Sequence, residues 1–126
     1  MAAGRTLIVL EDDPGARNAL CLVLSDWDFH AIGAPSAAEA MQALGAGAAG
    51  VAAIITDFDL GDGLNGVSES QALLAAGVKA PVLVISGSLG DRAARTAHAA
   101  GFEFLAKPVM PVDIRTWLDA AASAAA

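Results

Sequence analysis

Two patterns of apolar and polar residues alternate along the chain. One is a short apolar run, mostly rich in branched side chains, which is typical of a strand buried on both faces. The other places apolar residues three or four positions apart, which is typical of a helix with one buried side. Strands are expected at residues 7–10, 29–33, 51–56, 81–86 and 102–106, and helices at 14–27, 36–44, 67–76, 90–100 and 111–118.

Several residues mark where these helices begin and end. Ser36 is followed three positions later by Glu39, which is the pattern of a capping box at a helix N-terminus. Gly77 and Gly101 follow the third and fourth helical segments, where glycine commonly ends a helix. Pro111 is placed to open the last helix, which we expect to end at about residue 118 and to leave a short Ala-rich tail.

The strand–helix order repeats five times and predicts an α/β fold. We expect a five-stranded parallel sheet, doubly wound, with helices on both faces and right-handed crossovers. No Gly/Ser/Pro-rich linker interrupts the 126 residues, so we expect a single domain with its core at about residues 6–118. Ligands in such sheets bind at the carboxyl ends of the strands.

Polar residues gather at four of the predicted strand ends. They are Glu11, Asp12 and Asp13 after the first strand, Asp57, Asp59 and Asp62 after the third, Ser86, Gly87 and Ser88 after the fourth, and Lys107 with Pro108 after the fifth. Carboxylates placed close together repel one another, and a hard divalent cation such as Mg²⁺ relieves that repulsion. A lysine beside such a site is suited to holding a phosphoryl oxygen. The strand ends therefore predict a site for Mg²⁺ and a phosphoryl group.

Charge and composition exclude several other classes of function. The 14 acidic and 7 basic residues give a net charge of −7, which disfavours binding to nucleic acid or to an anionic membrane surface. The single cysteine excludes an internal disulfide and a cysteine-rich zinc site. No apolar stretch is long enough to span a membrane, and the N-terminus does not have the pattern of a signal peptide. We expect a cytoplasmic domain without direct membrane insertion.

Four segments, taken in order, resemble the response regulator receiver domain, the phosphoaspartate module of two-component signalling. They are LIVLEDDPGAR, IITDFDLGDGLNG, VLVISG and FLAKPV, and the resemblance spans residues 6–118. Each segment alone is a weak signal, but four of them in order at similar spacing are highly specific. The resemblance implies the flavodoxin-like (βα)5 fold of that family.

The resemblance also implies roles for single residues. Asp57 would accept the phosphoryl group, Lys107 would pair with it, and the Ser86 hydroxyl and Gly87 N–H would bind its oxygens. Glu11, Asp12, Asp57 and the backbone carbonyl of Asp59 would hold Mg²⁺. Ser86 and Phe104 would form the conformational switch, and the Lys107–Pro108 peptide would be cis.

The activity implied is signalling rather than turnover of a substrate. The phosphodonor would be a phosphohistidine on a histidine kinase or phosphotransfer protein, and the chain would promote only its own phosphorylation and dephosphorylation. Two settings fit, a stand-alone regulator and the receiver of a hybrid histidine kinase. The segment ITDFDL with its Gly-rich loop and the terse ending that begins KPV resemble hybrid-kinase receivers, which favours the second setting. A homodimer through the fourth-helix, fifth-strand and fifth-helix face, where Trp117 lies, is also implied.

Two alternatives use the same residues differently. The segment DFDLGDG resembles the Asp-x-Asp motif of haloacid-dehalogenase-like aspartyl phosphatases, in which Asp59 would be the general acid–base. That motif follows the first strand in those phosphatases, whereas here it follows the third. The second alternative is a degenerate receiver that only docks to partners, which the complete set of Glu11, Asp12, Asp57, Ser86 and Lys107 disfavours.

Overall fold

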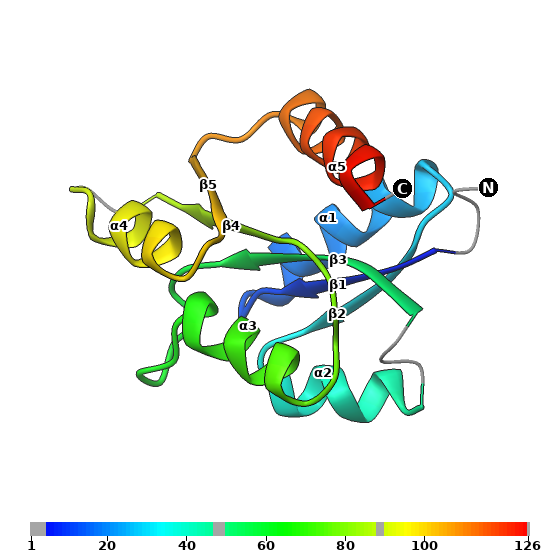
Figure 1. The fold of residues 1–126 in the computed structure, drawn as a ribbon, viewed down its shortest axis with the longest axis horizontal. Helices are drawn as coiled ribbons and strands as arrows, with labels where there is room; N and C mark the ends of the chain where they lie inside the picture. The colour runs from blue at the N-terminus through cyan, green and yellow to red at the C-terminus, as the bar shows by residue number, and fades with distance from the viewer. Residues whose placement is uncertain (1–4, 47–49, 88–89, 126) are drawn as a thin grey trace.

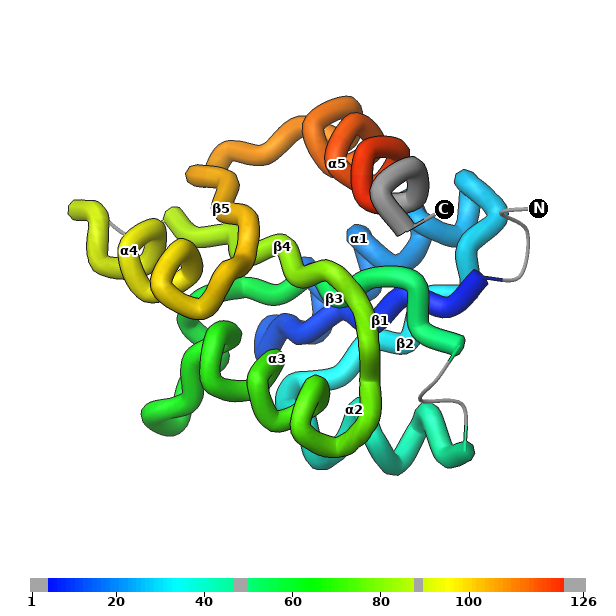
Figure 2. The backbone as a smooth tube through the Cα atoms, in the orientation of Figure 1, coloured from blue at the N-terminus to red at the C-terminus, as the bar shows by residue number. Residues whose placement is uncertain are grey.

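A computed structural model describes residues 5–46, 50–87 and 90–125 of the chain. Five strands and five helices alternate: β1 (Thr6–Leu10), α1 (Pro14–Asp26), β2 (His30–Ala34), α2 (Ala37–Leu44), β3 (Val51–Asp57), α3 (Gly66–Ala75), β4 (Val82–Ser86), α4 (Arg92–Ala99), β5 (Glu103–Ala106) and α5 (Pro111–Ala125). The strands form one parallel sheet in the order β2-β1-β3-β4-β5. Helices cover both faces of this sheet, as Figures 1 and 2 show. The predicted doubly wound α/β fold is confirmed.

Alternate residues of the central strands face opposite sides of the sheet, and each side has its own apolar core. In β1, Ile8 and Leu10 belong to the core under α2, α3 and α4, whereas Leu7 and Val9 belong to the core under α1 and α5. Strands β3 and β4 divide their buried residues between the two cores in the same way. Because both faces are covered, these strands are apolar at nearly every position, which is why the sequence shows continuous runs.

Short polar side chains begin three of the helices. Asp13, Ser36 and Asn65 each accept a hydrogen bond from a backbone N–H in the first turn of the helix that follows. The predicted cap at Ser36 is therefore confirmed, with the Glu39 N–H as its donor at 3.3 Å. A second acceptor, the Glu69 side chain of α3, takes a hydrogen bond from the Ala37 N–H at 2.9 Å. The α2 N-terminus is thus tied to α3 across the surface of the fold.

Two helices end at the glycines that the sequence singled out. Gly77 and Gly101 both have positive φ, of 113° and 81°. In each case the next residue donates its N–H to a carbonyl five residues back, as Val78 does to Leu73 and Phe102 does to Ala97. These bonds satisfy carbonyls that the helix end leaves open, and they turn the chain into the following strand region.

The last helix differs from the prediction. It was expected to end near residue 118, but α5 continues to Ala125. The residues beyond Leu118 are almost all alanine, the strongest helix former, and no glycine or proline follows Pro111. The predicted Ala-rich tail is therefore helical as far as the described residues reach.

Smaller differences occur elsewhere. Strand β2 lies one residue later than predicted, and α4 begins at Arg92 rather than at residue 90.

No helix in the described ranges has the length and apolar character needed to cross a membrane.

Candidate functional site

The acidic residues converge because β1 and β3 are neighbours in the centre of the sheet. Both strands run in the same direction, so Glu11 and Asp12, just beyond β1, lie beside Asp57 at the end of β3. One carboxylate oxygen from each of the three residues can be chosen so that all lie within 4.8 Å of one another. This is the arrangement that the strand-end analysis predicted for these three residues.

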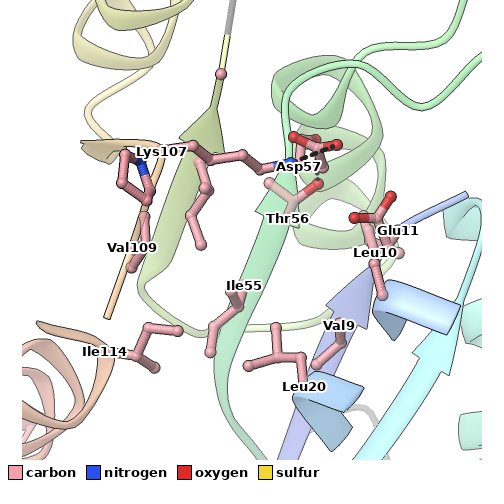
Figure 3. Close-up of a pocket in the computed structure, with 14 residues that line it drawn as sticks. Val9, Leu10, Glu11, Leu20, Ile55, Thr56, Asp57, Lys107, Val109 and Ile114 are labelled. Carbon is pink, nitrogen blue, oxygen red and sulfur yellow. Dashed lines mark hydrogen bonds and ion pairs between the residues drawn. The ribbon is translucent and has the colours of Figure 1, made fainter. Parts of the chain in front are cut away.

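The carboxylate of Asp57 is held from two directions. Its Oδ1 accepts a hydrogen bond from the Phe58 N–H at 3.0 Å, and its Oδ2 lies 3.5 Å from the Lys107 Nζ. Lys107 reaches it from the end of β5, as Figure 3 shows. The Asp57 side chain is 15% exposed and that of Lys107 is 46% exposed, so the ion pair forms at the mouth of the site. The Lys107–Pro108 peptide bond is cis.

Two neighbours fix the chain at Glu11. The backbone carbonyl of Glu11 accepts a hydrogen bond from the Arg17 Nη1 of α1 at 2.9 Å, and the Glu11 carboxylate accepts one from the Asp13 N–H at 3.3 Å. Asp13, the third acid of the run, turns away from the cluster, because its Oδ2 accepts from the Ala16 N–H at 2.7 Å. The three consecutive acids therefore divide into two cluster members and one helix cap.

Burial raises the pKa of two carboxyl groups in the cluster. For Asp57 the chief cause is desolvation, which the positive charge of Lys107 and the Phe58 N–H partly offset, while the charge of Asp59 raises the pKa further. For Glu11 desolvation again dominates, and Asp12 and Asp57 also raise the pKa. Raised values mean that the ionised forms are disfavoured in the absence of a cation.

A divalent metal ion fits this set of residues. Glu11, Asp12 and Asp57 supply oxygen atoms, the donors that Mg²⁺ prefers, and a bound cation would offset both the desolvation and the mutual repulsion of the carboxylates. Asp59, which was expected to add a backbone carbonyl, is exposed and forms an isolated antiparallel bridge with Asn65. This bridge joins the start of the β3–α3 loop to its end.

An open pocket of about 620 Å³ adjoins the cluster. Glu11, Asp57, Gly87 and Lys107 line its polar part. Its apolar part lies between α1 and α5, as Figure 3 shows, and is lined by Val9, Leu20, Ile55, Ile85, Val109 and Ile114, among others. No local sequence pattern predicted this apolar part, because the six residues named come from six separate elements or loops.

The remaining predicted residues lie on or just after β4 and β5, outside the cluster of three carboxylates. Ser86 ends β4 and is buried, and the next residue, Gly87, would place a Cβ only 3.3 Å from the Lys107 Cδ. Phe104 lies in β5 beside Val84 and packs against the core under α2, α3 and α4. Neither Ser86 nor Phe104 lines the pocket. Ser88 falls outside the described residues.

Gly66 is a residue of the site that the sequence analysis did not identify. A Cβ at this position would collide with the Asp57 carbonyl oxygen and with the Thr56 Oγ1. The Gly66 N–H donates to the Phe58 carbonyl at 2.7 Å, which closes the loop that follows Asp57. The close approach of the α3 N-terminus to β3 thus requires glycine. In sequence, Gly66 is simply one of several glycines in a loop, so nothing distinguished it.

Comparisons with known proteins agree with this geometry. The response regulator receiver domain family profile matches residues 7–119. None of the curated proteins matches the chain by sequence. Similar solved structures include the N-terminal domain of an uncharacterized protein from Wolinella succinogenes, at 30% identity over 96% of this chain and 95% of that chain, with a TM-score of 0.77.

Two further structures have names that state what they are. A response regulator receiver protein from Burkholderia phymatum is 26% identical over 94% of each chain, with a TM-score of 0.76. A response regulator receiver domain protein from Clostridium thermocellum is 20% identical over 94% of each chain, with a TM-score of 0.79, and that likeness bears on the fold alone. Because the family profile spans nearly the whole chain, this protein belongs to the response regulator receiver domain family of two-component signalling.

Proposed function

We propose that the domain receives a phosphoryl group on Asp57, with Mg²⁺ held by Glu11, Asp12 and Asp57. The observation that carries this proposal is the meeting of three carboxylates within 4.8 Å, one of them 3.5 Å from the Lys107 Nζ. The donor would be a phosphohistidine on a histidine kinase or phosphotransfer protein. We place the reaction in the cytoplasm, with a hybrid histidine kinase as the favoured setting.

The residues of the chain have distinct tasks in this transfer. An Asp57 oxygen attacks phosphorus, the bond from phosphorus to the imidazole nitrogen breaks, and the electron pair of that bond stays on the nitrogen. The Phe58 N–H and Lys107 hold the attacking carboxylate in a fixed orientation beforehand. Lys107 then pairs with a phosphoryl oxygen, and the Gly87 N–H and Ser86 hydroxyl bind the others. Mg²⁺, when bound, neutralises negative charge on the transferring group.

The output is a shift between two conformations of the chain. A phosphoryl group brings new negative charge to the site and attracts the Ser86 hydroxyl. Ser86 is buried at the end of β4, and Phe104 is half-buried on the adjacent strand, so movement of the first would open space for the second. The chain itself catalyses no other reaction and promotes only its own phosphorylation and dephosphorylation.

The two alternatives have less support. A phosphatase of the haloacid-dehalogenase type would carry its nucleophile after the first strand, whereas Asp57 ends β3, the third strand along the chain. A docking-only receiver would have no need for Glu11, Asp12, Asp57 and Lys107 to meet.

Intact mass after incubation with acetyl phosphate tests the proposal. Wild-type protein should gain one phosphoryl group in the presence of Mg²⁺, and Asp57→Asn should gain none. Asp62→Asn is a matched control, because Asp62 lies exposed in the loop after β3, outside the acidic cluster. A folded wild-type protein that gains no mass would favour the docking-only receiver. Repeated release of phosphate that is lost in Asp59→Asn would favour the phosphatase.

A further inference from the structure

A cation–π contact joins helix α4 to the residue that follows Asp57. The Arg92 guanidinium carbon lies 5.3 Å from the centre of the Phe58 ring. Arg92 is the first residue of α4, and Phe58 immediately follows β3, so the contact links two elements that are distant in sequence. The ring is otherwise enclosed, because Phe58 is only 2% exposed.

Phe58 is one of the two residues that hold the Asp57 carboxylate, and Lys107 is the other. The Phe58 N–H donates both to the Asp57 Oδ1 at 3.0 Å and to the Ile85 carbonyl of β4 at 2.8 Å. Its own carbonyl accepts from the Gly66 N–H at 2.7 Å. A rotation of the Phe58 backbone would therefore change the direction in which Asp57 presents its oxygens.

Helix stability gives no reason for an arginine at the first position of α4. A cation in the first turn of a helix is disfavoured by the helix dipole, and alanine has at least as high a helix propensity as arginine. The contact that links Arg92 to the Asp57 segment is the one with the Phe58 ring, whose centre lies 5.3 Å from the guanidinium carbon.

We propose that Arg92 is a positioning residue for the phosphorylation of Asp57: its guanidinium holds the Phe58 ring, and the Phe58 N–H in turn holds the attacking carboxylate. The inference rests on the proposed function of Asp57 as phosphoacceptor. It also gives α4, which follows the Ser86 strand end, a direct mechanical connection to the reacting group.

The test compares phosphorylation rates of variants on the same helix. With acetyl phosphate and saturating Mg²⁺, followed by intact mass over time, Arg92→Ala should slow phosphorylation about two- to fivefold, the factor that a cation–π contact at an exposed site supplies. Arg92→Lys should keep most of the rate, because an ammonium group also binds an aromatic face. Arg95→Ala is the matched control: it removes the same charge from α4 and breaks an exposed ion pair with Asp91.

A second pair of variants separates positioning from general weakening of the fold. In a Phe58→Leu background the ring is gone, so Arg92→Ala should have no further effect on the rate. Equal rates for Arg92→Ala and Arg95→Ala, or an Arg92→Ala effect that persists without the ring, would overturn the inference while leaving Asp57 as the phosphoacceptor. If wild-type protein is not phosphorylated at all, the proposed function fails first and the positioning role fails with it.

Discussion

The two faces of the sheet are covered to different degrees. The core under α2, α3 and α4 is large and continuous, and it includes Phe58, Leu60 and Val67 from the segment just after Asp57. The core under α1 and α5 is smaller, and a pocket of about 620 Å³ opens between those helices. Asp57 lines that pocket while Phe58, its neighbour, is buried on the opposite side. One face therefore fixes the backbone of the phosphoacceptor segment, and the other leaves its carboxylate accessible.

The largest expected effect comes from adding a side chain at Gly66, where α3 packs closely against β3. Gly66→Ala should lower the free energy of unfolding by about 3 kcal/mol or more, because the new methyl group collides with backbone and side-chain atoms of β3 that cannot move aside. Urea unfolding followed by circular dichroism measures this. Gly50→Ala is the control, since among the described residues a Cβ there meets no atom within 4 Å. Similar free energies of unfolding for the two variants would show that α3 and β3 can move apart to accommodate the methyl group.

Deletion of a leucine side chain on each face is a second way to compare them. Leu73 of α3 is fully buried, so Leu73→Ala should cost about 2–5 kcal/mol of unfolding free energy. Leu20 of α1 is half-buried beside the pocket, so Leu20→Ala should cost roughly 1 kcal/mol, because the space it leaves already adjoins solvent. Equal losses in urea unfolding would contradict the difference between the faces.

The smallest expected effect concerns the negative charge of the Asp57 carboxylate, which lines the pocket. Because burial raises the pKa of Asp57 in the folded state, that state holds its proton more tightly than the unfolded chain does. The stability linked to this group is therefore present in acid and lost as the pH rises through the folded-state pKa. Without Mg²⁺ at pH 7, Asp57→Asn should therefore raise Tm slightly, because the amide has no charge to desolvate.

Measuring Tm at lower pH shows whether the charge of Asp57 causes the difference between the variant and the wild type. The advantage of Asp57→Asn should shrink as the pH falls toward 4, since wild-type Asp57 takes up its proton in the folded state before it does so in the unfolded chain. Asp62→Asn, at an exposed loop position, should leave Tm unchanged at both pH values. A Tm that falls in Asp57→Asn at pH 7 would mean that the Lys107 ion pair outweighs the desolvation of Asp57.

The sequence predicted most of the fold because local signals and burial agree. The runs of β3 and β4 are apolar at nearly every position, as strands with two covered faces must be, and Ser36, Gly77 and Gly101 mark helix ends by their own chemistry. The end of α5 was missed because an alanine run contains no stop signal. Local sequence patterns therefore predict which helices and strands form more accurately than they predict where each one ends.

From the sequence, site residues could be predicted only where the β–α pattern implied which strand ends lie together. Glu11, Asp12 and Asp57 meet because neighbouring parallel strands end at the same edge, which the β–α pattern implies. The requirement for Gly66 and the contact between Arg92 and Phe58 depend on how closely α3 and α4 approach β3. Those distances are set by packing between separate elements of the fold, and no local pattern encodes them.

The short strand β5 limits how two copies of this domain could associate. It lies at the edge of the sheet, it has only four residues, and its first residue is the exposed Glu103. A second chain could form few backbone hydrogen bonds along such a short edge, and a charged side chain stands at its start. Self-association on this side would therefore rely on side chains such as Trp117 and not on sheet extension, which protects the domain from open-ended aggregation through β5.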